Sequence, residues 1–407
     1  MEIKPDITTK LDTNEGIILI AFVGIDDDAY KRVTSSMNPR AGYGFVRLDD
    51  ISQVDGCYFG VPEVVLVPDS LEITSLPEKG SEILTVTNSI VTEKGDNRLS
   101  LSEEEKMVIR GKGISYLQDS VDIITEVALA KRRKTLLEKY GKDLDEILNN
   151  ENRIDTNRLI ELFAAKDTVA LGHIKMVAEF SEVLADGMEL SEITTGLTEQ
   201  ERSDFNTIAL VHDIGKLVTP DQLLKNEDAF SSKEFSSMQQ HVDISLTLAK
   251  SEKTQELLGL ALKHHYRYDG RGYLVQSPEE IGDNIPQVAR MLAVIDAFDA
   301  ISDPGRKYQN NDPAESLVAK AVNILYTNSQ EQSKEFPFGG QFDPKIAHAF
   351  LLGFQQKFAT DEKFRMEIIG RELHTDDPAK IEERRTQIED CLDSVINRFG
   401  YNQEKVA

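Results

Sequence analysis

Short apolar runs alternate with polar stretches in the first third of the chain. Three of these runs, IILIAFVG, VPEVVLVPD and SEILTVTNSI, predict buried strands. A fourth strand is expected in GKGISYLQDS, where it leaves a glycine-punctuated turn. Alternation of this kind is typical of a parallel sheet with helices on both faces, so we expect an α/β domain over residues 14–135.

The remainder of the chain has a helical pattern. Apolar residues recur at helical spacing in DIITEVALAKRRKTLLEKY, and the highly charged residues 136–157 are expected to form a helical linker. We predict an all-α domain over residues 158–357. Residues 358–407 are charged and helical, with apolar spacing in KIEERRTQIEDCLDSVINRF that suits packing on a partner or, as we expect, on their own domain.

Composition narrows the classes of function. The formal net charge of −25 argues against DNA or RNA binding, which relies on Lys and Arg neutralising phosphates, although a locally positive site could still admit a small anion. Cys57 and Cys391 are the only cysteines, as expected in a reducing compartment. No secretory signal opens MEIKPDITTK, and the run IILIAFVGI is much shorter than the roughly 20 residues that span a bilayer. We expect a cytoplasmic protein without a membrane segment.

Candidate metal-binding residues occur in the helical part, where five of the seven histidines are found together with two aspartates. A single histidine on a helix face is ordinarily a core or capping residue, but this group is too large for that reading alone. Imidazole nitrogen and carboxylate oxygen bind Fe, Mn and Zn, and ligands on separate helices of a bundle can converge. The group comprises His173, His212, Asp213, His241, His264, His265 and Asp296.

Local spacing suggests how these side chains could divide between two metals. His212 and Asp213 are adjacent, so on a helix they point roughly 100° apart, and the carboxylate could bridge two metals while the imidazole holds one. His264 and His265 could likewise reach different metals. Lys216 follows His212 by four residues, on the same face, where an ammonium would meet a substrate phosphate.

The motifs HDIGK and HHYRYDGRGY, with His241 between them, resemble the HD-GYP branch of the HD phosphohydrolase superfamily. The resemblance extends over about residues 155–357 and includes PQVARMLAVIDAFDAI and QFDP. It implies an all-helical domain with a two- or three-metal centre that hydrolyses the second messenger cyclic di-GMP to pGpG or GMP.

Carried over residue by residue, the resemblance makes all seven residues of the group metal ligands. Asp213 and Lys216 would be the catalytic residues, since Asp213 bridges the metals and Lys216 faces the phosphate. Two nearby cations lower the pKa of a shared water for attack on phosphorus. Arg306 falls where the family has an arginine that holds the substrate, and Arg271 and Tyr273 are further candidate substrate contacts, Tyr273 by stacking on guanine.

Four positions depart from the family pattern. Members with three metals carry an acidic ligand ahead of the first histidine, where this chain has Val169, so we expect two divalent metals, with Fe or Mn favoured. The glutamate after the paired histidines is Tyr266, the proline after GY is Leu274, and the last basic residue after RKY is Gln309. None of these changes removes an expected ligand, but they alter the loop that shapes substrate access.

The N-terminal part resembles a response-regulator receiver domain, a flavodoxin-like fold, in the order of its apolar runs. Its chemistry departs from that family, since VVLVPDS places Asp69 one step late and Gln118 stands where the family has lysine. The acidic triplet DDD at 26–28 is also read as a solvated loop. We therefore expect a degenerate, non-phosphorylated module used for homodimerisation or for contact with a signalling partner.

Three functions remain in competition at this point. The first is a metal-dependent cyclic di-GMP phosphodiesterase. The second is a binding module that holds metals and cyclic di-GMP with negligible turnover and acts through a partner protein. Tyr266 and Leu274, which depart from the family pattern, favour this alternative. The third is an HD phosphohydrolase of another nucleotide.

Overall fold

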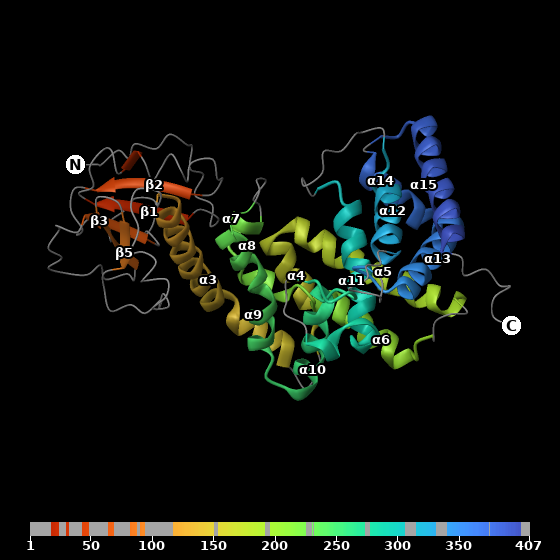
Figure 1. Ribbon diagram of the computed structural model, residues 1–407, viewed down its shortest axis with the longest axis horizontal. Coiled ribbons are helices and arrows are strands. Elements are labelled where there is room, and N and C mark those ends of the chain that lie inside the picture. The colour runs from red at the N-terminus through yellow and green to blue at the C-terminus, as the bar shows by residue number, and fades with distance from the viewer. Residues whose placement is uncertain are drawn as a thin grey trace. The chain divides into compact units, whose positions relative to one another are not determined.

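The computed structural model contains a five-stranded sheet, one long helix and a helical bundle (Figure 1). No helix among the described residues combines the length and the apolar character needed to cross a membrane. The structure describes residues 18–23, 30–31, 43–48, 64–68, 82–87, 90–93, 117–149, 154–191, 196–224, 230, 232–272, 277–305, 315–330, 340–373 and 375–399.

The strands lie in the order β2-β1-β3-β4-β5. The first four are parallel to their neighbours, and β5 is antiparallel to β4. The strands are β1 (Ile18–Val23), β2 (Tyr43–Leu48), β3 (Val64–Pro68), β4 (Glu82–Thr87) and β5 (Ile90–Glu93).

The first three strand predictions are confirmed by β1, β3 and β4. Strand β1 is the continuous apolar run ILIAFV, and Ile20, Ala21, Phe22 and Val23 are buried, as suits a strand with a neighbour on each side. The fourth predicted strand is wrong where it can be judged, because 117–120 begin helix α3 (Leu117–Asn149). The rest of that segment lies outside the described residues.

Helix α3 also changes the expected boundaries. It runs without a break through the predicted domain end at residue 135 and through most of the predicted linker at 136–157. The chain divides into two compact units, residues 1–142 with 215–241, and residues 143–214 with 242–407. Within the first unit, Arg133 of α3 donates to Ser237 O at 2.7 Å and to Ser237 Oγ at 2.8 Å, tying α3 to α8 (Ser232–Gln239).

The second unit is helical. Its helices are α4 (Thr156–Lys166), α5 (Thr168–Leu190), α6 (Glu199–Val211), α10 (Glu252–Leu262), α11 (Gln287–Ser302), α12 (Leu317–Gln330), α13 (Pro344–Thr360), α14 (Glu362–Glu372) and α15 (Pro378–Arg398). Helix α9 (His241–Leu248) begins where the two units meet in sequence, while α7 (Asp221–Leu224) lies in the first unit.

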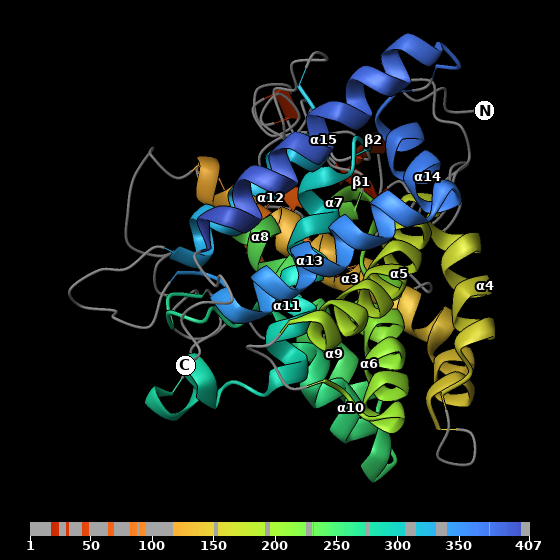
Figure 2. The same cartoon turned by 90° about the vertical axis from the view of Figure 1, so that its right-hand side faces the viewer.

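Helices α5, α11 and α13 lie side by side in this bundle (Figure 2). Phe180 of α5 joins them, with its ring centroid 5.4 Å from that of Phe298 on α11 and 5.7 Å from that of Phe350 on α13. His173 lies two turns before Phe180 on the same helix face, so this aromatic packing holds the α5 histidine opposite α11.

The C-terminal helices pack on the same core, as the apolar spacing of the sequence suggests. Ile388, Leu392 and Val395 of α15 are buried in it at spacings of four and three residues. His348 of α13, one of the two histidines outside the group of candidate ligands, is also buried, and burial lowers its pKa to about 4. It is a core histidine, whereas His374 lies outside the described residues.

Candidate metal centre

The first cluster of ligand-type side chains lies where α5 faces the end of α6. Asp167 caps α5 by accepting from Val169 N at 2.8 Å, and this cap fixes the turn that leads to His173. Helix α6 ends at Val211, so His212 and Asp213 occupy the turn that follows. His173, His212 and Asp213 are each buried, and one ligand atom from each lies within 4.8 Å of the others.

Helix α11 adds a second carboxylate to this cluster. Asp296 Oδ1 lies 3.1 Å from His173 Nε2 and 3.6 Å from His212 Nε2. Asp213 Oδ2 lies 3.5 Å and 3.3 Å from the same two nitrogens. Two imidazole nitrogens therefore face two carboxylate oxygens within the second unit.

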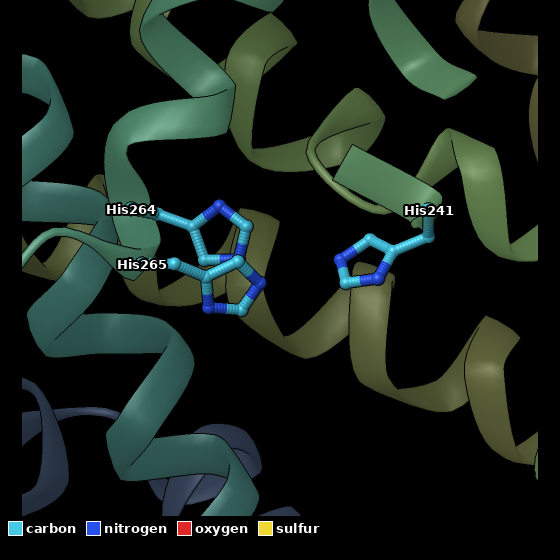
Figure 3. A group of neighbouring side chains, drawn as sticks. All are labelled: His241, His264 and His265. Carbon is cyan, nitrogen blue, oxygen red and sulfur yellow. The ribbon is translucent and has the colours of Figure 1, made fainter. Parts of the chain in front are cut away.

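The second cluster consists of His241, His264 and His265, whose ligand nitrogens also lie within 4.8 Å of one another. Figure 3 shows the three imidazole rings turned toward a common space. His264 and His265 belong to the short helix η4 (Lys263–His265), and their ring centroids are 3.7 Å apart. The His264 centroid is 5.1 Å from that of His212, so the two clusters adjoin.

Backbone and carboxylate acceptors orient the rings. His212 Nδ1 donates to Ala209 O at 2.8 Å, and His264 Nδ1 to Ala261 O at 2.5 Å. His241 Nδ1 donates to the carbonyl of Met238 at 2.6 Å. A carbonyl oxygen can only accept, so the proton is on Nδ1 and the Nε2 lone pair is left for another partner, as metal-ligating histidines require.

These residues fit divalent metal ions. His212 Nε2 is buried and makes no hydrogen bond of ordinary geometry, a costly arrangement for a polar atom unless it coordinates something. Neutral imidazole and ionised carboxylate are the forms that bind metal. Burial lowers the pKa of His264 to about 4, which keeps it neutral. Burial alone would raise the pKa of Asp296, but the electrostatic effect of the neighbouring His173 and His212 imidazoles outweighs it and holds that pKa well below its usual range.

Asp299 is a site residue that the sequence reading missed. Its side chain is fully buried, and its Oδ2 accepts from His173 Nδ1 at 2.6 Å, which orients that ring as the carbonyls orient the others. The signal was present in IDAFDAI, because Asp299 follows Asp296 by three residues and so shares its helix face.

The loop after the paired histidines is organised by Asp269, which is fully buried. Arg267 donates to both of its carboxylate oxygens, at 2.9 and 2.7 Å, and Arg271 donates to it from Nε at 2.8 Å and from its backbone N at 2.9 Å. Gly270 has φ +76°, a left-handed backbone conformation that favours glycine. Arg271, a predicted substrate contact, is thus held by an ion pair within its own loop.

The other predicted substrate residues have different outcomes. Lys216 is half-buried in helix η3 (Ile214–Val218). Tyr273, Leu274 and Arg306 lie outside the described residues, as does Gln309. Tyr266 is described, and its ring lies 5.6 Å below Lys263 Nζ, a cation–π contact in place of the charge that the family's glutamate would carry.

Gly215 lies directly after the His212–Asp213–Ile214 turn and touches the backbone of His241. A Cβ placed on Gly215 would meet His241 O at 2.0 Å and His241 Cα at 2.9 Å. Because the obstacle is backbone, no side-chain rotation can relieve it. The glycine therefore allows the close approach of the segment that begins α9.

We predict that Gly215→Ala moves His241 and weakens metal binding. A displacement of a few tenths of an ångström or more degrades a site that tolerates about 0.5 Å, so the dissociation constant for Mn(II) should rise at least about tenfold. Equilibrium dialysis against Mn(II) measures this, with Gly259→Ala on α10 as the control, since no atom lies within 4 Å of a Cβ there. Equal affinity for Gly215→Ala and the wild type would contradict the role assigned to this glycine.

One family model matches the part of the chain that contains both clusters. Residues 170–301 match the HD domain family, and this segment contains every residue of both clusters. Among others, the chain is similar to the cyclic di-GMP phosphodiesterase response regulator RpfG of Xanthomonas campestris, with 27% identity over 56% of this chain and 55% of the relative. It is similar to a cyclic di-GMP phosphodiesterase of Thermotoga maritima, with 28% identity over 55% of this chain and 53% of the relative. It is also similar to the 3'3'-cGAMP-specific phosphodiesterase 2 of Vibrio cholerae, with 28% identity over 56% of this chain and 41% of the relative. The chain spans about half the length of the curated relatives it matches.

Proposed function

We propose that this chain is a metal-dependent phosphodiesterase that hydrolyses cyclic di-GMP, in the manner of the HD-GYP branch of the HD superfamily. The observation that carries the proposal is the buried cluster in which His173 and His212 turn their Nε2 atoms toward Asp213 and Asp296 while their Nδ1 atoms are held by other partners. The HD domain match and the names of the relatives support the same reaction.

We propose two divalent ions, with Fe or Mn favoured, because the ligands form two adjoining clusters. His173, His212 and Asp296 would hold one ion, His241, His264 and His265 the other, and Asp213 would bridge them. When bound, the pair would supply Lewis-acid stabilisation of a phosphodiester and an activated water at neutral pH.

The chain's own residues would then bind and orient the substrate. Asp213 would help to orient the attacking water, and the Lys216 ammonium would neutralise charge that grows on the non-bridging phosphate oxygens. Arg271, Tyr273 and Arg306 would contact the ligand, Tyr273 by stacking on a guanine. For Arg271 this requires that it keep one face available while Asp269 holds it, which suits the five donors of a guanidinium.

The N-terminal unit would serve signalling rather than catalysis. The parallel strand order β2-β1-β3-β4 supports a receiver-like, doubly wound module. Gln118, which stands where that family has lysine, supports a module that is not phosphorylated and that acts by homodimerisation or partner contact. The domain plan remains a receiver-like unit, a helical connector, an HD-GYP domain and C-terminal helices packed on it.

A second candidate is hydrolysis of another cyclic dinucleotide. Its support is the similarity to three proteins of Vibrio cholerae that are named 3'3'-cGAMP-specific phosphodiesterases. The two candidates share the metal chemistry and differ in the base that the loop after His265 must accept.

The two candidates are separated by initial rates on cyclic di-GMP and on 3'3'-cGAMP, with the chain loaded with Mn(II) or Fe(II). We expect the higher rate on cyclic di-GMP, with pGpG or GMP as product. A higher rate on 3'3'-cGAMP would favour the second candidate. If neither is hydrolysed while cyclic di-GMP binds in a calorimetric titration, the chain is a binding module and the enzymatic proposal is wrong.

A further inference from the structure

Arg371, in the last turn of α14, reaches the buried carboxylate that orients His173. Its Nη2 lies 2.9 Å from Asp299 Oδ1, while the other oxygen of Asp299 accepts from His173 Nδ1. The same guanidinium lies 3.8 Å from Asp303, one turn further along α11. A continuous series of polar contacts thus runs from α14 through Asp299 to a residue of the first metal-type cluster.

The energetic need for Arg371 follows from the burial of Asp299. The Asp299 side chain is fully buried, and a buried carboxylate is strongly destabilising unless both of its oxygens have partners. His173 donates to one oxygen, and the Arg371 guanidinium forms an ion pair with the other. Without the guanidinium, nothing holds that oxygen in place, and a carboxylate that rotates away no longer holds the Nδ1 proton of His173 in the present geometry.

Helix α14 is well suited to hold Arg371 in place. The next residue, Glu372, accepts from Val318 N at 2.7 Å and from Ser316 Oγ at 3.1 Å, so it caps the start of α12. Glu372 also forms a buried ion pair with Arg384 of α15. The end of α14 is therefore fixed by two helices while Arg371 points to a third, α11.

We propose that Arg371 is a positioning residue of the metal centre, acting through Asp299 on His173, so that the functional unit includes α14. This helix lies beyond residues 170–301, the segment that matches the HD domain. The inference rests on the metal-binding part of the proposed function and does not depend on the substrate.

The test is the Mn(II) affinity of the full-length chain, measured by equilibrium dialysis. Arg371→Met should raise the dissociation constant about tenfold, because removing partners of metal-ligating histidines costs about 10–100-fold in affinity. Arg371→Lys should recover part of the loss, since an ammonium can still pair with Asp299. The matched control is Arg365→Met on the same helix, where the guanidinium donates to Phe358 O and Ala359 O, and its Mn(II) affinity should equal that of the wild type.

A coupling measurement separates positioning from a general loosening of the helix. If Arg371 acts through Asp299, then in an Asp299→Asn background the Arg371→Met change should add less than about twofold to the loss. The proposal would be overturned if the two changes raise the Mn(II) dissociation constant independently, so that their fold-changes multiply. It would also be overturned if Arg365→Met loses as much Mn(II) affinity as Arg371→Met. An unchanged affinity in Arg371→Met would overturn it as well.

These readouts are independent of catalysis. If the wild-type chain binds Mn(II) but hydrolyses neither cyclic dinucleotide, the proposed function fails while the loss of affinity in Arg371→Met still supports the positioning role. If hydrolysis is seen and Arg371→Met binds Mn(II) as the wild type does, the function stands and the positioning role fails.

Discussion

Replacing Asp213 by alanine is expected to remove bound metal and phosphodiesterase activity together. Asp213 is buried, and its Oδ2 lies 3.5 Å from His173 Nε2 and 3.3 Å from His212 Nε2, so it faces both imidazoles of the first cluster. Loss of a mere partner of a ligand costs about 10–100-fold, so loss of this proposed bridging ligand should lower activity at least about 100-fold. Metal content by mass spectrometry and initial rates on cyclic di-GMP measure both effects.

The control for this prediction is Asp204→Ala on α6, the helix that leads into His212. Asp204 pairs with Lys253 at 3.2 Å and is partly exposed, so its loss should leave metal content and rate unchanged. The fold should survive in Asp213→Ala, since removing a buried carboxylate in the absence of metal also removes its desolvation cost. An Asp213→Ala chain that keeps both metal and activity would refute the proposed bridging role.

A methyl group on Gly353 is expected to destabilise the helical unit by about 3 kcal/mol or more, the upper end for overpacked cores. A Cβ on this residue of α13 would lie 2.1 Å from Val183 O and 2.8 Å from Gly187 N, both backbone atoms of α5. On the opposite helix, a Cβ on Gly187 would lie 1.9 Å from Ala349 O. The helices could accept a side chain only by moving apart, which would open the contact between Phe180 and Phe350.

Urea unfolding of the metal-free chain, followed by its helical circular dichroism, measures this effect. Gly370→Ala is the matched control, because Gly370 is exposed on α14 with no atom within 4 Å of a Cβ. Alanine there should stabilise by about 0.5–1 kcal/mol, the usual difference in helix propensity. If Gly353→Ala unfolds within about 0.5 kcal/mol of the wild type, the close crossing of α5 and α13 is not as described.

The ligand-type residues could be predicted from the sequence because each lies in a short motif. His212, Asp213, His264 and His265 occur in HDIGK and HHYRYDG, where residue type and spacing together are specific. The structure brings these residues into two clusters with His173, His241 and Asp296. Local sequence thus carries most of the proposed centre.

The supporting residues were harder to predict, for a physical reason. Arg371 is distant in sequence from the cluster, and an arginine near a helix end is ordinarily a solvated residue. Only the tertiary fold, in which α14 packs against α13 and α15, brings Arg371 to Asp299. Asp299 could have been predicted from the sequence, because it follows Asp296 by three residues and so lies on the same face of a helix.

For the fold too, some elements could be predicted from their local sequence and others could not. Strand β1 was predicted from its unbroken apolar run, whereas β2 was missed because YGFVRL carries a glycine and an exposed arginine. GKGISYLQDS was wrongly assigned to a strand because GISYL is apolar and β-branched, although Leu117 already belongs to α3. Short apolar runs do not distinguish a strand from the start of a helix.

The most direct test of the central proposal is cyclic di-GMP hydrolysis by one preparation of the chain, first stripped of metal with a chelator and then reloaded with Mn(II). A His212→Ala, Asp213→Ala chain is treated in parallel. We expect pGpG or GMP from the reloaded wild type and none from the stripped chain or the double variant. Product at the same rate from the stripped chain, or no product from the reloaded wild type above the double variant, would contradict the proposal.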